Sequence, residues 1–236
     1  MEPVVASSSV WGTRMIDYEF YETAEPFTRW LWAWLEQQGL GIRGRCFEPC
    51  VGNGAIKRAP YLHGHWFTND LDPRWPADVH KDATDITLWQ AHEVDWTVTN
   101  PPFSLAVPIL DRALTFSRVG VVMYLRLSIH EPLKTGERRT FFADHKPTAT
   151  LILPRFAHQR SRAKGIWSTD SMTSCWCVWI KGETRQFIDY APPSVMDDLE
   201  AFTPEYRIRM DAINGLTGSE LDRQTQYRAQ WKGAAA

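Results

Sequence analysis

The feature that most constrains this fold is a regular alternation of short apolar runs with helical patterns along the chain. Seven runs read as strands, at 45–48, 65–69, 77–80, 94–99, 120–127, 149–153 and 174–180. Helical patterns lie before and between them, at 26–38, 85–91, 104–116 and 137–144. Such alternation predicts a doubly wound α/β sheet, because consecutive parallel strands need crossover helices that cover both faces of the sheet.

Composition and charge narrow the class of protein. The chain has 236 residues, of which 44% are hydrophobic and 23% charged, as in ordinary globular domains. Its net charge of −2 gives no overall attraction to nucleic acid, so binding of that kind must rest on a local basic patch. We find neither a signal peptide nor a stretch of transmembrane length, and therefore expect a cytoplasmic protein with no membrane partner.

The cysteines and histidines give no sequence signal for a metal. Cys46, Cys50, Cys175 and Cys177 form no C-x-x-C pair, and the seven histidines show no metal-ligand spacing. Cysteines without such spacing usually behave as small buried apolar side chains. We therefore expect reduced thiols and no metal, with Cys175, Cys177 and Trp179 on one face of a buried strand.

The domain organisation that we expect is a catalytic domain over 1–192 followed by a helical extension over 193–236. The extension is polar, and helical patches occur near 195–202 and 205–213. No internal repeat or low-complexity block divides the chain further.

The first candidate site follows the first predicted strand. Residues 47–54 read F-E-P-C-V-G-N-G, and glycines at this place let the backbone approach a ligand closely. A dinucleotide fingerprint would need a third glycine at position 57, where the chain has Lys57, so a nicotinamide cofactor is not expected. Glu48 can bind an ammonium or hydroxyl groups. A purely structural turn explains the two glycines equally well.

The second candidate site is a group of acidic residues after the second and third predicted strands. Asp70 and Asp72 begin 16 residues after Gly54, close to the spacing at which doubly wound folds place an acid for ribose hydroxyls. Asp82 follows the third predicted strand and is a better ligand candidate than Asp85, which can cap the next helix. Turn formation is the alternative explanation for these aspartates.

The third candidate site is Asn100-Pro101-Pro102-Phe103, which ends the fourth predicted strand. Proline ends strands and asparagine is common in turns, so these residues could be a simple turn. They could also form the rigid lip of a pocket for a planar substrate. The position favours the pocket, because the carboxyl ends of parallel strands meet at one sheet edge and ligands bind there.

Together these three motifs resemble the S-adenosylmethionine-dependent amino-methyltransferases, and specifically the DNA adenine-N6 methyltransferases. That family carries an aromatic-acid-x-x-x-G-x-G loop, an acid after the second strand, and [D/N/S]-P-P-aromatic after the fourth. Tyr21-Glu22-Thr23 resembles the family's aromatic-x-Thr element. The motif order is similar to the gamma arrangement, and the nearest likeness is to short phage or prophage orphan enzymes. The resemblance covers about 18–180.

The resemblance implies a Rossmann-like methyltransferase fold, a cofactor and a mechanism. The sheet would be seven-stranded and mostly parallel, with an antiparallel last strand and helices on both faces. The Asn100 side-chain oxygen and the Pro101 carbonyl would accept hydrogen bonds from the adenine amine, Pro102 would keep the lip rigid, and Phe103 would stack on a flipped base. The residues implied to bind S-adenosylmethionine are Tyr21, Thr23, Glu48, Pro49, Gly52, Asn53, Gly54, Asp70, Asp72, Asp82 and Ala83.

A basic segment offers a contact surface for DNA or RNA. The loop 155–172 carries several cations and few acids, and we predict that it grips phosphates together with segment 127–145. The predicted contacts are Arg155, Arg160, Arg162, Lys164 and Trp167, the last near the tip of the loop. A solvated surface loop is the alternative.

Two further functions stay open on the sequence alone. The Asn-Pro-Pro-aromatic motif also serves planar amides, so the substrate could be RNA or a protein glutamine. A non-catalytic nucleic-acid-binding protein that has kept the fold is a different class, although such a protein would need none of Gly52, Gly54, Asn100 and Phe103 together.

Overall fold

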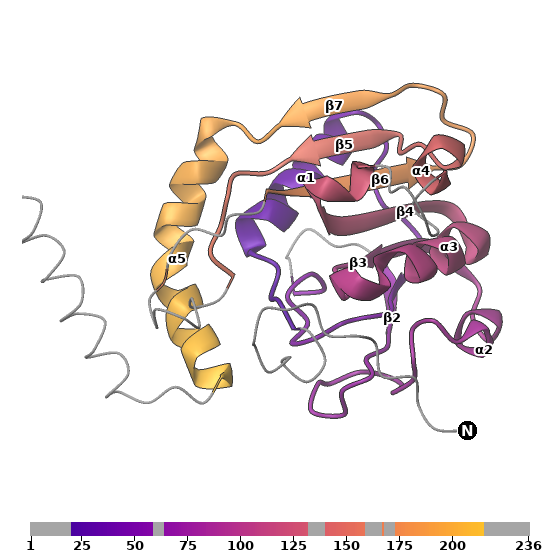
Figure 1. The fold of residues 1–236 in the computed structure, drawn as a ribbon, viewed down its shortest axis with the longest axis horizontal. Coiled ribbons are helices and arrows are strands. Elements are labelled where there is room, and N and C mark those ends of the chain that lie inside the picture. The colour runs from indigo at the N-terminus through magenta and orange to yellow at the C-terminus, as the bar shows by residue number, and fades with distance from the viewer. Residues whose placement is uncertain (1–19, 59–63, 132–139, 159–166, 168–172, 215–236) are drawn as a thin grey trace, which may run out of the picture.

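Seven strands form one sheet with the order β2-β1-β3-β4-β6-β5-β7 (Figure 1). The structure is a computed structural model that describes residues 20–58, 64–131, 140–158, 167 and 173–214. The strands are β1 Arg45–Glu48, β2 His65–Thr68, β3 Val94–Thr99, β4 Ser117–Arg126, β5 Ala149–Ile152, β6 Ser174–Ile180 and β7 Phe187–Tyr190. Every neighbouring pair is parallel except the two that involve β6, which runs antiparallel to β4 and β5. The predicted α/β sheet with one antiparallel strand is confirmed.

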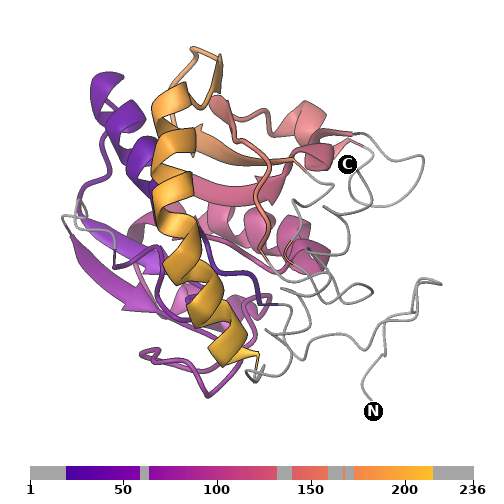
Figure 2. The same ribbon diagram turned by 90° about the vertical axis from the view of Figure 1, so that its left-hand side faces the viewer.

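Helices cover both faces of the sheet, as predicted. They are α1 Glu25–Gln37, α2 Ile86–Gln90, α3 Ala106–Phe116, α4 Phe141–Asp144 and α5 Pro193–Ile213, with short 3-10 turns η1 Phe103–Leu105 and η2 Leu127–His130. Apolar side chains of α1 and α5 belong to the core on one face, and those of α2 and α3 to the core on the other. Figure 2 shows α5 running along the first of these faces. None of the described helices has the length and apolar character needed to cross a bilayer.

The two cores follow from the alternation of side chains along the central strands. On β4, Val122 and Tyr124 enter the core under α1, whereas Val121 and Met123 enter the core under α3. On β6, Trp176 and Val178 point to the first core, and Cys175, Cys177 and Trp179 to the second. The predicted shared face of these last three residues is confirmed.

The prediction of a strand at 77–80 is wrong. Within that run, only Val79 pairs with the sheet, through a single bridge to Asn69. The Asp78 carboxylate accepts hydrogen bonds from the Thr68 backbone N–H and hydroxyl, both at 2.8 Å. A side chain therefore takes a place that a backbone carbonyl would fill in a ladder, which ends regular pairing after one residue.

Two elements near the C-terminus also differ from expectation. The seventh strand of the sheet is β7, which pairs in parallel with β5 and was not predicted, so β6 is not the last strand. The helical patches near 195–202 and 205–213 form one helix, α5, which continues through Pro204. Its buried residues Val195, Leu199, Tyr206 and Met210 belong to the first core.

Candidate functional site

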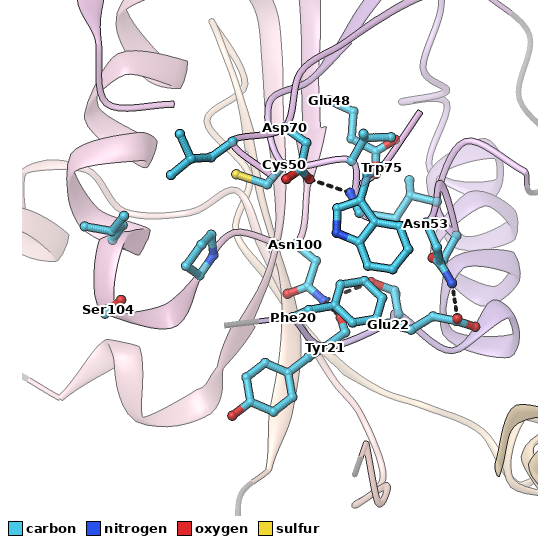
Figure 3. A pocket seen from close by; sticks show the side chains of 18 residues that line it. Phe20, Tyr21, Glu22, Glu48, Cys50, Asn53, Asp70, Trp75, Asn100 and Ser104 are labelled. Atoms are coloured by element: carbon cyan, nitrogen blue, oxygen red, sulfur yellow. Dashed lines mark hydrogen bonds between the residues drawn. The ribbon is translucent and has the colours of Figure 1, made fainter. Parts of the chain in front are cut away.

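A cavity of about 210 Å³ lies at the carboxyl ends of β1, β2 and β3 (Figure 3). The chain passes from β1 to β2 on one side and places β3 on the other side of β1, so this edge is a topological switch point. All three candidate motifs contribute to its lining. The predicted site residues among the lining residues are Tyr21, Thr23, Glu48, Gly52, Asn53, Asp70, Asn100 and Pro102.

The glycine turn after β1 is held against the end of β2. The Gly52 backbone N–H donates to Asp70 Oδ2 at 2.7 Å, and the Val51 N–H donates to the Asn69 carbonyl at 2.9 Å. Gly52 has a φ of 51°, and a Cβ added there would lie 2.7 Å from the Phe20 ring. Any side chain at this position would therefore collide with the cavity wall, in addition to the strain of a positive φ.

Glu48 brings a buried carboxyl to the floor of the cavity. The residue is 1% exposed, and its Oε2 has no hydrogen-bond partner among the described residues. Burial raises the pKa of the Glu48 carboxyl well above its usual value, and the Asp70 charge acts in the same direction, whereas Lys57 and Arg58 oppose the rise. Its Oε2 atom is therefore left for a donor that a ligand could supply.

The structure gives the two predicted acids after β2, Asp70 and Asp72, different positions relative to the cavity. Asp70 lines the cavity, and burial raises the pKa of its carboxyl, although the Asp72 and Gly52 backbone N–H groups oppose that effect. Asp72 instead pairs with Arg74, with the Arg74 Nε at 2.8 Å from Asp72 Oδ2, and does not line the cavity. Of the two, Asp70 is therefore placed to meet a ligand, and Asp72 stabilises the turn.

Asp82 and Ala83 also lie outside the cavity lining, so their predicted contact with the cofactor stays a prediction. The Asp82 side chain accepts hydrogen bonds from the Thr84 backbone N–H and hydroxyl, both at 2.8 Å, so it forms a local turn. Ala83 is buried in the core under α3, and its carbonyl accepts a hydrogen bond from the Trp89 indole. Pro49 and Gly54 shape the turn without lining the cavity.

Asn100 is held in one orientation. Its Nδ2 donates to the Tyr21 carbonyl at 2.8 Å and to the Thr23 hydroxyl at 3.0 Å (Figure 3). A backbone carbonyl can only accept, so the group facing it must be the amide NH₂. The Asn100 side-chain oxygen is consequently left as an acceptor, and none of the described residues donates to it.

Phe103 lies on the far side of this lip, beside a second cavity of about 260 Å³. Its ring stacks on Tyr21, with ring centroids 5.7 Å apart and an interplanar angle of 20°. The Arg126 guanidinium lies 4.6 Å from the Phe103 ring centroid, and the Arg126 Nε is buried without a partner among the described residues. Arg126 and Ser128 line the second cavity together with Phe103. Pro101 is buried and lines neither cavity.

Sequence reasoning missed residues that shape the cavity from other parts of the chain. Phe20 and Trp75 form an aromatic wall, with ring centroids 4.7 Å apart. Glu22, 2% exposed, accepts a hydrogen bond from Asn53 and pairs with Arg209 on α5, whose Nε lies 3.1 Å from both carboxylate oxygens. Phe20 and Glu22 flank the recognised Tyr21, which was a usable signal, but no sequence spacing relates Glu22 to Arg209.

The structure changes the interpretation of the basic loop. Trp167 is 6% exposed and packs against α5, with its ring centroid 6.1 Å from that of Tyr206, so it is not at an exposed tip. This burial is at odds with its predicted contact to nucleic acid. Arg155 is exposed, as such a contact requires. Arg160, Arg162 and Lys164 lie outside the described residues.

Comparisons with known proteins support the fold. No protein-family profile and no curated protein matches the sequence. The methyltransferase subunit of a type I restriction-modification system from Streptococcus thermophilus is similar in structure, with a TM-score of 0.50 and 14% identity over 79% of this chain. A putative class I S-adenosylmethionine-dependent methyltransferase from Listeria monocytogenes gives a TM-score of 0.51 and 11% identity over 80% of this chain.

These matches cover the neighbours to different extents. The chain spans 53% of the Streptococcus subunit, about half its length, and 72% of the Listeria protein. At these identities the likeness concerns the fold, and the protein has the Rossmann-like fold of the class I methyltransferases.

Proposed function

We propose that the protein transfers a methyl group from S-adenosylmethionine to the exocyclic N6 amine of adenine in DNA. The observation that carries this proposal is the orientation of Asn100. Its amide NH₂ is fixed by Tyr21 and Thr23, so its oxygen is left as an acceptor in the lining of the first cavity, three residues before Phe103, which lines the second.

The first cavity fits the chemistry of S-adenosylmethionine. That molecule carries an ammonium, a sulfonium, ribose hydroxyls and a flat purine, and when bound it supplies an electrophilic methyl group. Glu48 offers a buried carboxyl oxygen without a partner, Asp70 offers a second carboxylate, and Phe20 and Trp75 offer an aromatic wall. We assign Glu48 to a cationic group and Asp70 to the ribose hydroxyls.

Asn100 would act on the methyl acceptor. The lone pair of an exocyclic amine is delocalised into its ring, which makes the amine a poor nucleophile. By the resemblance, hydrogen bonds from the amine to the Asn100 oxygen and the Pro101 carbonyl would draw the nitrogen toward a tetrahedral geometry and localise that lone pair, although Pro101 itself lines neither cavity. Because these acceptors are fixed by the fold, positioning supplies the rate and no strong base is needed.

The second cavity would receive the target base. Phe103 provides a ring for stacking, and Arg126 provides a cation beside that ring. A base that stacks on Phe103 has to share the ring with Tyr21 and Arg126. A base reaches such a pocket only after leaving the duplex. The restriction-modification neighbour from Streptococcus thermophilus adds support for a DNA substrate.

The experiment that tests the proposal uses labelled S-adenosylmethionine with separate pools of DNA, RNA and protein. After digestion, we expect the label in N6-methyladenine from DNA. Label in RNA, in cytosine or in glutamine would redirect the proposal to that substrate. Failure to bind S-adenosylmethionine in calorimetry would contradict methyl transfer altogether and favour a non-catalytic nucleic-acid-binding protein.

Substitution of Asn100 provides the matching mutational test. We expect Asn100→Ala to lower the transfer rate by at least about 100-fold, the order seen when a positioned hydrogen-bonding group is removed. Cofactor binding should remain within a few-fold of wild type in calorimetry. The matched control is Asn214→Ala, an exposed residue at the end of α5, which should retain full activity. An active Asn100→Ala enzyme would remove Asn100 from the mechanism.

A further inference from the structure

Two cysteines and one histidine converge in the core under α3, outside the lining of both cavities. Cys175 and Cys177 lie on β6, and His130 is the last residue of η2. The two Sγ atoms are 3.6 Å apart, and the Cys177 Sγ lies 3.4 Å from His130 Nε2. All three donor atoms lie within 4.8 Å of one another.

The fold brings these residues together without any sequence spacing that could reveal them. Side chains at i and i+2 of a strand share a face, so both thiols point into the core under α3. His130 reaches them from η2, which continues from the end of the neighbouring strand β4. The histidine is 45 residues before Cys175 in the sequence, which is why the C-x-C pair alone did not indicate a metal.

The distances agree with those of a tetrahedral zinc site. Zinc–sulfur bonds of about 2.3 Å and zinc–nitrogen bonds of about 2.0–2.1 Å place two sulfurs roughly 3.8 Å apart and a sulfur roughly 3.5 Å from a nitrogen. The observed separations of 3.6 Å and 3.4 Å are close to these values. Two of the three donor pairs therefore already have the spacing of zinc ligands, and the third pair, Cys175 and His130, lies within 4.8 Å.

Charge and burial also suit a divalent ion with soft ligands. Both cysteines are 0% exposed, where an isolated thiolate would be costly unless a positive partner is present. Two thiolates and a neutral imidazole around Zn²⁺ give a site with no net charge. The partly buried His130 provides the side from which an ion can enter.

We propose that Cys175, Cys177 and His130 bind one Zn²⁺ ion that ties η2 to β6. Three donors come from the described residues, and water would complete a four-coordinate sphere. The site is independent of the proposed methyl transfer. It would nevertheless fix η2, whose Ser128 and Ile129 line the second cavity.

Cobalt substitution of the full-length, untagged protein tests this inference directly. We expect about one Co²⁺ per chain, an intense sulfur-to-cobalt charge-transfer band in the near ultraviolet, and visible bands of tetrahedral strength. Cys175→Ser and Cys177→Ser should each remove most of the charge-transfer intensity, and His130→Gln should weaken binding at least 10-fold. Cys46→Ser, a buried cysteine on β1 outside the cluster, is the matched control and should leave the spectrum unchanged.

A second measurement uses only the wild-type protein and therefore does not depend on whether the variants fold. We expect wild-type protein prepared without chelators to contain zinc by elemental analysis, and its thermal midpoint to fall with a zinc chelator and recover when Zn²⁺ is restored. Absence of the charge-transfer band in the wild type would overturn the inference. So would a Cys175–Cys177 disulfide in the mass spectrum of freshly purified protein, or an unchanged midpoint in the presence of chelator.

Discussion

At the scale of single residues, Glu48 couples the stability of the protein to ligand binding. Its carboxyl is buried in the cavity, and burial raises the pKa, so the folded state favours the protonated form. Below the ordinary glutamate pKa of about 4.3 the carboxyl is protonated in both the folded and the unfolded chain. Burial then removes no charge from water and carries no desolvation penalty for a carboxylate. As the pH rises above that value, the unfolded chain releases its proton more readily, and the folded protein loses stability.

We therefore expect Glu48→Gln to stabilise the ligand-free protein by about 1–3 kcal/mol at neutral pH, because a neutral amide avoids the charge penalty. The same change should weaken binding of S-adenosylmethionine by at least about 10-fold, since the cationic group of the ligand loses its carboxylate partner. Denaturant unfolding between pH 4 and 8 checks the first effect, and calorimetry the second. The stability gain should vanish near pH 4; a gain that is independent of pH would contradict the assignment.

Under the proposed function, Arg126, which lines the second cavity, would meet a charged substrate there. We expect Arg126→Met to weaken nucleic-acid binding about 10-fold and to reduce the slope of log affinity against log salt by about one, as loss of one phosphate contact does. Binding of S-adenosylmethionine should not change. The matched control is Arg118→Met near the opposite end of β4, where the arginine pairs with Asp95. Equal loss of affinity in both variants would argue against a specific role for Arg126.

At the scale of elements, α5 supports the segment 20–23, which lines the first cavity. Arg209 pairs with the buried Glu22 carboxylate, and the Tyr206 hydroxyl lies 3.0 Å from the His158 carbonyl. His158 in turn contacts the Tyr124 hydroxyl and the Glu22 carbonyl, at 2.9 Å and 3.2 Å. The helix thus holds Glu22 in place next to Tyr21 and Thr23, which orient Asn100.

A double-mutant cycle measures this support. We expect Arg209→Gln to destabilise the fold by about 2–3 kcal/mol, less than the roughly 3–5 kcal/mol of a fully buried pair because Arg209 is partly exposed. Adding Glu22→Gln to the Arg209→Gln variant should recover part of the lost free energy of unfolding. Arg43→Gln breaks the exposed pair with Glu36 and is the matched control, which should leave the stability almost unchanged. Additive effects at Glu22 and Arg209 in denaturant unfolding would show that the pair is not coupled.

The sequence predicted those elements whose pattern is local. A local pattern of apolar residues marks the strands β1, β3 and β6 and the helix α1. Gly52 and Asn100 could be predicted as site residues because each follows the end of such a strand. Strand β7 was not predicted because it is a short edge strand with mostly exposed residues, so no apolar alternation marks it. Arg209, Arg126 and Trp75 reach the cavities only through tertiary packing, and nothing in their neighbouring residues indicates it. Asp72 and Asp82 could not be distinguished from the cavity-lining Asp70, because turn and ligand aspartates look alike in sequence.

At the scale of the whole molecule, the C-terminal helix is integrated with the sheet. Val195, Leu199, Tyr206 and Met210 are buried in the same core as α1. Burying four such side chains contributes roughly 6–10 kcal/mol as an upper estimate, comparable to the total stability of a typical domain. A division at residue 192 would therefore leave a large apolar face of the sheet uncovered.

We expect a chain that ends at Pro192 to lose its cooperative thermal transition and to aggregate, because that face becomes exposed. A chain that ends at Asn214 retains α5 and is the matched control; it should unfold cooperatively. Calorimetry and circular dichroism provide the measurements. Cooperative unfolding of the shorter chain would show instead that residues 1–192 form an independent domain.

The contact between Glu22 and Arg209 also has a consequence for synthesis of the protein. It joins residues 187 positions apart, and through Asn53 it includes the glycine turn after β1. During translation the strands that shape the cavity emerge long before α5 does. A nascent chain therefore carries the binding motifs without the helix that fixes Glu22, and the complete site forms only after the last helix has left the ribosome.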